Sequence, residues 1–268
     1  MATYAVLLAA AGATLGPLAL SFMTSFKTPR QFATQSALTA PDPWTGENYR
    51  ALLGGQTVGF GHALLVTTGV VVVVLIGQLT TSVMAAFAFA RLDFPGRDLL
   101  FWAYVATLMV PPVVTVVPLY LMVSQVGLRN TFWGLVLPYI FGSPYAIFLL
   151  RQYFRGIPQE LVDAARVDGA GPGTVLLRII LPLSRPIMAT LGVITVVTHW
   201  NNFLWPLIIT NGSAWQVVTT ATANLQGRYN GNWTLVMAAT TLAMAPLMAV
   251  FVVFNKQIVS SIQITGFR

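Results

Sequence analysis

The sequence predicts an all-α integral membrane protein with six transmembrane helices, and composition is the first reason. Apolar residues make up 56% of the 268 residues and charged residues only 8%, whereas a soluble domain carries about 25% charged residues. The mean hydropathy is +0.74. The 14 basic and 7 acidic side chains leave six long uncharged stretches, each able to supply the roughly 20 apolar residues that cross a bilayer. The predicted spans, within one domain covering 1–268, are about 4–26, 63–90, 99–123, 132–150, 186–210 and 233–255.

The first two spans differ in character. Span 4–26 could instead be a cleaved signal peptide, but it lacks a basic start and is longer than a typical signal core. Residues 27–62 are rich in Pro, Thr and Gly and predict an irregular cap. Small residues in the second span would let neighbouring helices approach closely. The segment "RLDFPGRD" then predicts a tight turn.

Prolines interrupt the last four predicted spans. Each removes a backbone donor and clashes with the carbonyl four residues before it, so we expect bent or broken helices. Prolines are frequent in membrane helices generally, but a broken helix is tolerated where it lines a cavity or packs inside protein. The prolines are Pro111, Pro112, Pro118, Pro138, Pro144, Pro206 and Pro246.

Basic residues predict the orientation of the spans. One side of the membrane receives nine Lys and Arg residues and the other side five. The positive-inside rule places the richer side in the cytoplasm, together with loop 151–185 and both termini. The nine are Arg91, Arg97, Arg151, Arg155, Arg166, Arg178, Arg185, Lys256 and Arg268, and the five are Lys27, Arg30, Arg50, Arg129 and Arg228.

The loop 151–185 predicts two short helices. Pro158 suits a first helical position, acidic Glu160 and Asp163 favour the positive helix start, and Gly169 is placed to end the helix, which therefore covers about 158–168. Gly171 and Pro172 can start a second helix, which runs through Val175, Leu176, Ile179 and Ile180 until Pro182 resets the chain.

The first of these helices has a narrow face of small and apolar residues. The residues that recur at helical spacing are Ile157, Leu161, Ala164, Ala165 and Asp168. Such a face could dock in the groove of a partner protein, with the flanking Arg166 and Arg178 meeting acidic groups. It could equally lie on the lipid surface, which exploits the same amphipathic pattern. The pattern alone leaves both open.

The same loop resembles the conserved loop of binding-protein-dependent ABC importer permeases. That loop is written E-A-A, three residues, G, nine residues, I, one residue, L-P, and it matches Ala164, Ala165, Gly169, Ile179, Leu181 and Pro182. Asp163 stands where the pattern has Glu, which keeps the charge and shortens the side chain. "ARLDFPGR", "PLYLMVSQVGLRNTFWGLVLPY" and "WNNFLWPL" resemble the second permease subunit of carbohydrate importers of the maltose and glycerol-3-phosphate type.

The resemblance implies a type I ABC importer permease (MetI-like) fold in a bacterial inner membrane. It implies as partners a homologous second permease subunit, a cytoplasmic nucleotide-binding ATPase dimer and an extracytoplasmic solute-binding protein, which the outside loop 211–232 would contact. Residues about 158–170 would form the coupling helix to the ATPase. The implied coupling residues are Glu160, Asp163, Ala164, Ala165, Asp168, Gly169, Ile179, Leu181 and Pro182. ATP and Mg²⁺ would bind the partner ATPase, because this chain has no glycine-rich GK[ST] loop and needs no cofactor of its own.

The fifth span is the candidate substrate path. Its segment "THWNNFLWPL" places amides and aromatic rings at membrane depth, which suit a neutral polyhydroxyl solute. Hydrogen bonding between helices is the competing explanation, since polar side chains in membranes commonly provide it. Related sequences often have Asp at the position of Asn202. The candidate residues are Thr198, His199, Asn201, Asn202 and Trp205.

Several other classes of function are disfavoured. The spans contain no Asp, Glu, Lys or Arg for ion coupling, which argues against a self-sufficient secondary transporter. An enzyme using His199 would lack a nucleophile and base set, so we expect no catalytic residues. His62 and His199 lack the spaced partners of a metal site, and no Cys is present for thiolate ligands. No basic run indicates nucleic acid. The leading prediction is an importer permease for a sugar or related solute; an importer of a glycerol-3-phosphate-like solute would need cationic groups from its partner permease.

Overall fold

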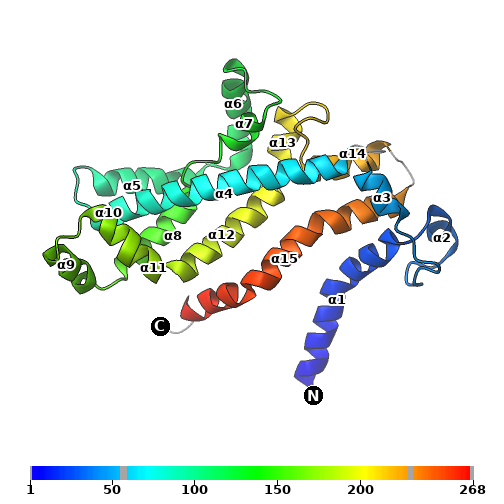
Figure 1. Cartoon of the computed structure of the whole chain (residues 1–268), viewed down its shortest axis with the longest axis horizontal. Helices are drawn as coiled ribbons and strands as arrows, with labels where there is room; N and C mark the ends of the chain where they lie inside the picture. The colour runs from blue at the N-terminus through cyan, green and yellow to red at the C-terminus, as the bar shows by residue number, and fades with distance from the viewer. Residues whose placement is uncertain (1, 55–58, 229–231, 266–268) are drawn as a thin grey trace. The chain divides into compact units, whose positions relative to one another are not determined.

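The computed structural model describes residues 2–54, 59–228 and 232–265, and within these ranges the chain forms helices joined by turns, with no strand (Figure 1). Three helices are long and apolar enough to cross a membrane alone: α1 (Ala2–Ser25), α4 (Phe60–Arg91) and α15 (Trp233–Thr265). They coincide closely with the predicted spans 4–26, 63–90 and 233–255. The number of candidate spans in the described chain rises to five if two sharply bent helix pairs each count as one span.

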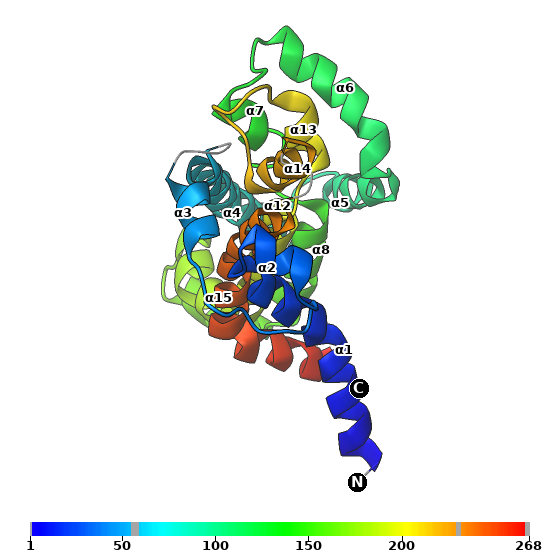
Figure 2. The same cartoon turned by 90° about the vertical axis from the view of Figure 1, so that its right-hand side faces the viewer.

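The predicted span 99–123 is a bent pair. Helix α5 (Arg97–Ala106) and the short η1 (Thr107–Met109) end before Pro111, and α6 (Pro112–Gln125) continues at 102° to them. Figure 2 shows α6 turning away from α5. The predicted span 132–150 is split into α7 (Phe132–Val136) and α8 (Pro144–Arg155). Prolines therefore mark breaks at 110–111 and 137–143, as expected, whereas Pro118 and Pro246 lie inside continuous helices.

The chain divides into two compact units, which are described separately. The first comprises Met1–Thr68 and Asn202–Ala249, and the second comprises Gly69–Asn201 and Val250–Arg268. Besides parts of the long helices, the first unit contains α2 (Pro29–Thr34), α3 (Glu47–Leu53), α13 (Leu204–Ile209) and α14 (Val218–Arg228). The second contains α5 to α8, α9 (Gln159–Val167), α10 (Pro172–Val175), η2 (Leu176–Ile180), α11 (Leu181–Leu183) and α12 (Arg185–Trp200).

The first unit is held by buried hydrogen bonds around Asn48. Its amide nitrogen donates to the carbonyls of Ser25 at 2.8 Å and Lys27 at 2.9 Å. Its amide oxygen accepts from the Thr234 hydroxyl at 3.2 Å. These bonds tie the segment after α1 to the start of α15. The loop predicted as an irregular cap is thus partly helical and anchored.

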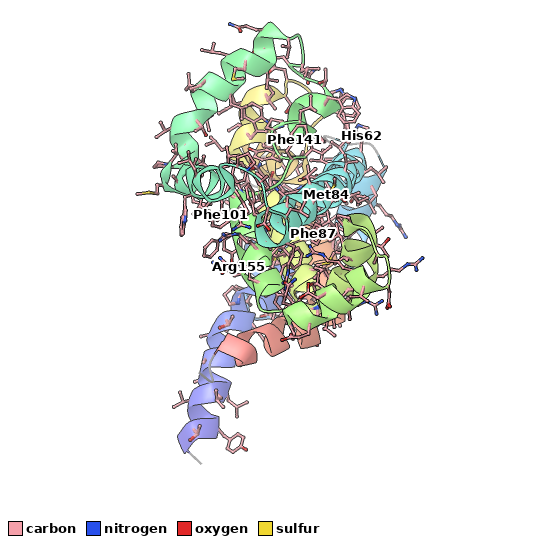
Figure 3. All side chains as sticks on the ribbon, turned by 90° about the vertical axis from the view of Figure 1, so that its left-hand side faces the viewer. His62, Met84, Phe87, Phe101, Phe141 and Arg155 are labelled. Carbon is pink, nitrogen blue, oxygen red and sulfur yellow. The ribbon has the colours of Figure 1, made fainter. Side chains whose placement is uncertain are left out.

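An aromatic and aliphatic core fills the second unit. Phe87 of α4 and Phe101 of α5, both labelled in Figure 3, belong to it together with Leu150 of α8. Ile180 and Leu191 extend the same cluster to η2 and α12. The core therefore joins the long helix α4 to the segments on both sides of loop 151–185.

The break between α7 and α8 lies against α4. Its backbone is satisfied by side chains: the Gln78 amide donates to the Tyr139 carbonyl at 3.1 Å, and the Ser143 amide donates to the Ser82 hydroxyl at 3.2 Å. The Tyr104 hydroxyl donates to the Gly142 carbonyl. Non-helical backbone at membrane depth requires such partners, because hydrocarbon offers none.

Glycine permits the close approach of α4 to this break. A Cβ on Gly77 would lie 2.3 Å from Ile140 Cγ1 and 2.8 Å from the Ile140 carbonyl oxygen, distances that real Cβ contacts do not show. We expect Gly77→Ala to push the break away from α4 and lower the free energy of unfolding by about 1–3 kcal/mol, as overpacking does. Denaturant unfolding of the protein in detergent micelles measures this.

Gly192→Ala is the matched control. Its Cβ would meet only Leu75 Cδ1 and Leu79 Cδ1, both at an ordinary 3.8 Å. We expect its stability to stay level or rise slightly, because alanine restricts the unfolded chain more than glycine. Equal stability of Gly77→Ala and the wild type would contradict the close-packing argument.

Candidate functional site

The loop 151–185 begins with a short, well-formed helix. Helix α9 runs from Gln159 to Val167, with Pro158 at its N-cap and Asp168 at its C-cap. The predicted helix 158–168 differs only by these two capping residues. Pro158 is extended (ψ 133°) and therefore precedes the helix instead of starting it.

The two faces of α9 have different surroundings. Val162 is buried and Ala165 half-buried against the core of the second unit, as is Ile157 just before the helix. The opposite face carries Leu161, Ala164, Val167 and Asp168 to the surface, and Val167 is 88% exposed. The prediction that Ile157, Leu161, Ala164, Ala165 and Asp168 form a single face is therefore wrong. Val162 packs inward, and of the five predicted residues only Leu161, Ala164 and Asp168 share the outer face.

Gly169 ends α9 in a left-handed conformation, with φ of +82°. The Gly169 amide donates to the Arg166 carbonyl at 3.0 Å and the Ala170 amide to the Ala165 carbonyl at 2.9 Å. This pair of bonds is the Schellman motif, in which glycine avoids the strain a Cβ would suffer. A Cβ at Gly169 would meet nothing within 4 Å, so conformation and not space selects glycine here.

The second predicted helix extends further than expected. Helix α10 continues through the π-helical turn η2 into α11, with Pro182 inside α11. The chain turns at Ser184, where the segment 172–183 meets α12 at 80°. The prediction that Pro182 resets the chain is wrong by two residues: Pro182 directly follows the π-helical turn, in which the Leu181 amide donates to the Leu176 carbonyl, and the helix continues to Leu183. Ile179 and Leu181 are half-buried there and Pro182 is exposed.

The acidic residues of α9 are exposed. Asp163 accepts from the Gln159 amide at 2.9 Å and lies 3.9 Å from the Arg166 guanidinium. Glu160 and Asp168 are also exposed. Exposed pairs of this kind add little stability. The carboxylates are therefore available on the surface beside the outer face of α9.

Arg91 anchors the start of α9. One of its terminal nitrogens donates to the carbonyls of Phe154 and Ile157, each at 2.5 Å, and the other donates to the Gln159 side chain. These contacts tie the end of α4 to the junction of α8 and α9 (Figure 1). The sequence identified Arg91 only as a loop charge, and no local pattern indicated these carbonyl partners.

Arg151 is a second anchor, and it is buried. Its Nε donates to the Phe89 carbonyl at 3.2 Å, and a terminal nitrogen lies 3.0 Å from Asp98. Its guanidinium carbon is 3.9 Å from the centre of the Phe101 ring, a cation–π arrangement. Burial lowers the pKa of this guanidinium, but arginine remains charged at physiological pH. Arg151 thus joins α8 to α4 and α5.

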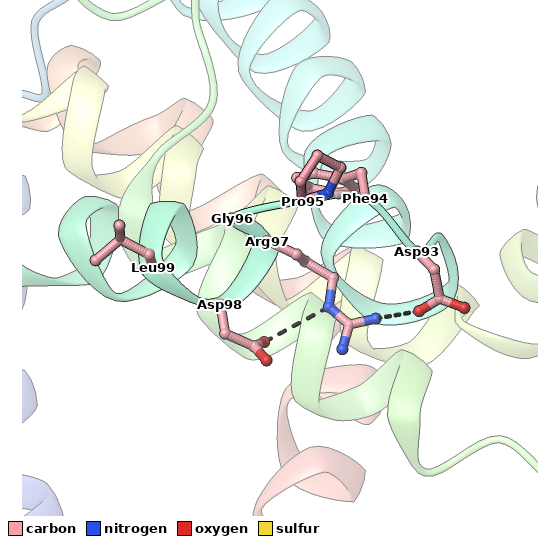
Figure 4. A pocket seen from close by; sticks show the side chains of 7 residues that line it. All are labelled: Asp93, Phe94, Pro95, Gly96, Arg97, Asp98 and Leu99. Carbon is pink, nitrogen blue, oxygen red and sulfur yellow. Dashed lines mark hydrogen bonds and ion pairs between the residues drawn. The ribbon is translucent and has the colours of Figure 1, made fainter.

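The turn between α4 and α5 supports this anchor. Arg97 lies 2.8 Å from Asp93 and 3.5 Å from Asp98 (Figure 4). Gly96 adopts a φ of +77° at the start of α5. The segment "RLDFPGRD" is the tight turn that the sequence predicts, and Asp98 is shared between Arg97 and Arg151.

A cavity of about 560 Å³ lies beside the α7 to α8 break, within the second unit. Its wall has amide, hydroxyl, imidazole and aromatic groups and no charged side chain. The Tyr139 and His199 rings lie 5.0 Å apart, and Gln78 accepts from the Thr195 hydroxyl at 3.2 Å. The polar and aromatic residues that line it are Gln78, Tyr104, Tyr139, Phe141, Ser143, Tyr145, Thr195, Thr198 and His199.

Only part of the predicted substrate path meets this cavity. Thr198 and His199 line it, whereas Asn201 is exposed and donates to the Val197 carbonyl of its own helix at 2.8 Å. Asn202 and Trp205 belong to the first unit, where Trp205 is buried. Helical spacing placed Asn201 near Thr198, but α12 ends at Trp200, so that spacing no longer applies to Asn201.

The histidines have separate environments. His62 is bonded through Nε2 to the Ala214 carbonyl at 2.9 Å, within the first unit. His199 lies beside the cavity. The described residues contain no cluster of three or more His, Cys, Asp or Glu side chains that could hold a metal.

Comparison with known sequences identifies several relatives. The family described as "binding-protein-dependent transport system inner membrane component" matches residues 78–264. The sn-glycerol-3-phosphate transport system permease protein UgpE of Brucella abortus (strain 2308) is 34% identical over 253 residues, covering 92% of this chain and 89% of that protein. The diacetylchitobiose uptake system permease protein NgcG of Streptomyces coelicolor is 30% identical over 258 residues, covering 94% and 83%.

Solved structures share the fold. A chain of a bacterial ABC transporter involved in the import of the acidic polysaccharide alginate superposes with a TM-score of 0.83 at 21% identity, covering 95% of this chain and 94% of that one. A chain of the bacterial alginate ABC transporter in complex with an alginate pentasaccharide-bound periplasmic protein gives 0.66 at 16% identity, covering 95% and 92%.

The Arg91 contacts lead to a testable expectation for α9. Arg91→Gln removes the charged donor to the Phe154 and Ile157 carbonyls, and hydrogen bonds to charged groups contribute about 1.5–3 kcal/mol each. We expect amide hydrogen exchange in α9 to accelerate by on the order of tenfold or more, measured by mass spectrometry. Arg155→Gln, at an exposed position in the last turn of α8, should leave that exchange unchanged. Equal protection in both variants would contradict the anchoring role.

Proposed function

This chain belongs to the family of binding-protein-dependent transport system inner membrane components, and we propose that it carries a sugar or related polyhydroxyl solute as one permease subunit of an ATP-driven importer. The family assignment makes it a multi-pass transport subunit of an inner membrane. The proposal adds the solute class, the coupling helix and the partners. In this arrangement ATP and Mg²⁺ bind a partner ATPase, and the chain contributes the membrane path.

The observation that carries the proposal is the outer face of α9. Leu161 and Val167 are large apolar side chains exposed on a helix that packs to the core through Val162 and Ala165, and Ala164 between them leaves the backbone accessible. Exposed apolar patches with a polar rim are typical of protein interaction sites. Glu160 and Asp168 provide part of that rim. We therefore assign this face to the groove of the cytoplasmic ATPase, with both chain termini on the same side of the membrane.

Anchoring makes α9 suitable for coupling. Arg91 links its start to α4, and Gly169 fixes the turn that leads to Ile179, Leu181 and Pro182. A displacement of α9 by the ATPase would then be passed to α4 and α8. On the opposite side of the membrane, the predicted contact for the solute-binding protein includes α14 (Val218–Arg228); residues 229–231 of that loop lie outside the described chain.

The cavity beside the α7 to α8 break is the proposed substrate path. Its hydroxyl, amide and imidazole groups can hydrogen-bond a polyol, and its tyrosines can stack on the apolar face of a sugar ring. The glycerol-3-phosphate permease relative raises the alternative of a phosphorylated solute. A phosphate is best held by Arg or Lys, and neither lines this cavity. A neutral solute therefore suits these residues better, unless the second permease supplies the positive charge.

Co-purification tests the importer proposal. We expect the chain, extracted in gentle detergent, to recover an ATPase and a second permease identified by mass spectrometry. Ala164→Trp should abolish recovery of the ATPase while the second permease stays bound, because the indole blocks approach to the exposed face of α9. Gln125→Trp, exposed on α6, is the size-matched control and should recover both. Recovery of the chain alone with uptake intact would favour a self-sufficient transporter.

The cavity assignment has its own test. Thr198→Val keeps the side-chain shape but removes the hydroxyl from the wall, so we expect the KM for uptake to rise about 3- to 10-fold, the worth of one hydrogen bond. Asn201→Ala should leave KM unchanged, because the Asn201 amide is bonded to its own helix. Uptake of radiolabelled solute in cells that express each variant measures both. An effect of Asn201→Ala equal to that of Thr198→Val would contradict the assignment.

A further inference from the structure

A second, apolar pocket lies between α4 and the segment that follows α9. It has a volume of about 370 Å³ and shares no lining residue with the cavity of the substrate path. Leu79, Val83 and Met84 of α4 form one wall, and Leu176, Leu177 and Leu181 form the other. Thr80 is the one residue with a polar side chain among those that line it. The pocket is therefore built for an apolar occupant.

Local backbone geometry creates the pocket. The π-helical turn η2 contributes Leu176 and Leu177, and the 80° turn at Ser184 leads the chain away into α12. Gly173 adds no side chain, and a Cβ there would meet nothing within 4 Å. Val175 and Ile180 of this segment are buried in the same core as Val83 of α4, whereas Leu176 and Leu177 line the pocket. π-helical turns are often found at functional sites.

The pocket is open to the surroundings of α4. Met84 is 59% exposed and Leu177 is 64% exposed. Helix α4 is long and apolar enough to span a bilayer, so its exposed side can face hydrocarbon chains. Water would find almost no hydrogen-bond partner in a space lined in this way. An acyl chain matches both the apolar wall and the open side.

Two arginines lie close in sequence to residues that line the pocket. Arg178 follows Leu177 directly, and Arg185 lies four residues after Leu181, at the start of α12. Both are exposed, and neither forms an ion pair with a carboxylate among the described residues. The positive-inside orientation places them at the cytoplasmic leaflet, where anionic lipids are found. Basic groups next to an apolar pocket are the pattern that binds an anionic lipid headgroup.

We propose that this pocket is a binding site for an anionic phospholipid of the cytoplasmic leaflet. One acyl chain occupies the space between α4 and η2, and the headgroup phosphate pairs with Arg178 and Arg185. The bound lipid then contacts the segment that connects α9 to α12. Its presence would stabilise the turn at Ser184 and so connect membrane composition to the coupling loop.

The test uses the complex purified from native membranes and phosphatidylglycerol with a photoreactive acyl tail, compared with phosphatidylcholine carrying the same tail. We expect phosphatidylglycerol to label peptides that contain Met84 and Leu177 preferentially. Arg178→Gln combined with Arg185→Gln should weaken phosphatidylglycerol binding by about 25-fold, since each basic group near the surface contributes about fivefold. Arg155→Gln is the charge control and should leave binding unchanged.

Filling the pocket gives an independent measurement. Gly173→Leu places a side chain in the pocket and should reduce labelling by both lipids, whereas Gly171→Leu, at an open position that does not line it, should not. Equal labelling by the two lipids would overturn the headgroup assignment. A crosslinker at Leu177 that captured a helix of the second permease in place of lipid would overturn the site itself. Neither outcome affects the role of α9, which the co-purification experiment tests separately.

Discussion

The backbone between α7 and α8 is not helical, and side chains of α4 and α5 satisfy its hydrogen bonds; much of the second unit follows from that arrangement. A helix that stops at membrane depth exposes carbonyl and amide groups that hydrocarbon cannot bond. Gln78, Ser82 and Tyr104 supply the missing partners from α4 and α5. Their side chains reach because Gly77 lets α4 come close. The same break provides the polar wall of the cavity, so structural support and the proposed solute path share residues.

Two arginines, Arg151 buried and Arg91 half-buried, connect the segments around the start of loop 151–185. The guanidinium of Arg151 contacts a carbonyl of α4, a carboxylate of α5 and an aromatic ring of α5. Arg91 does the same for the carbonyls where α8 gives way to α9. Loops are usually mobile, yet this one starts from two points fixed to the core. The fixed start explains how a nine-residue helix keeps its apolar outer face exposed without collapsing onto its surroundings.

The sequence predicted local features better than contacts between distant segments. Capping rules located α9 to within one residue at each end and identified Gly169 as its stop, because those signals are local. The predicted single face of α9 was wrong, since Val162 and Leu161 are equally apolar and periodicity cannot tell which one meets the core. The turn at Ser184 was assigned to Pro182, because a proline indicates that a helix can end nearby but does not fix the residue at which it ends. The anchors Arg91 and Arg151 depend on segments more than fifty residues apart, and the separation of Asn201 from the cavity depends on the end of α12 at Trp200.

The connection of α9 to α8 and α4 differs from its connection to α12. Toward α8 and α4, charge-assisted hydrogen bonds from Arg91 to main-chain carbonyls hold the start of α9 in place. Toward α12, the chain passes through a π-helical turn and an 80° bend, where the Ser184 hydroxyl is buried without a hydrogen-bond partner among the described residues. A displacement of α9, which the proposed coupling requires, would therefore be passed on directly to α4 and α8 and less directly to α12. Under that proposal the two sides of the cavity would move one after the other and not together.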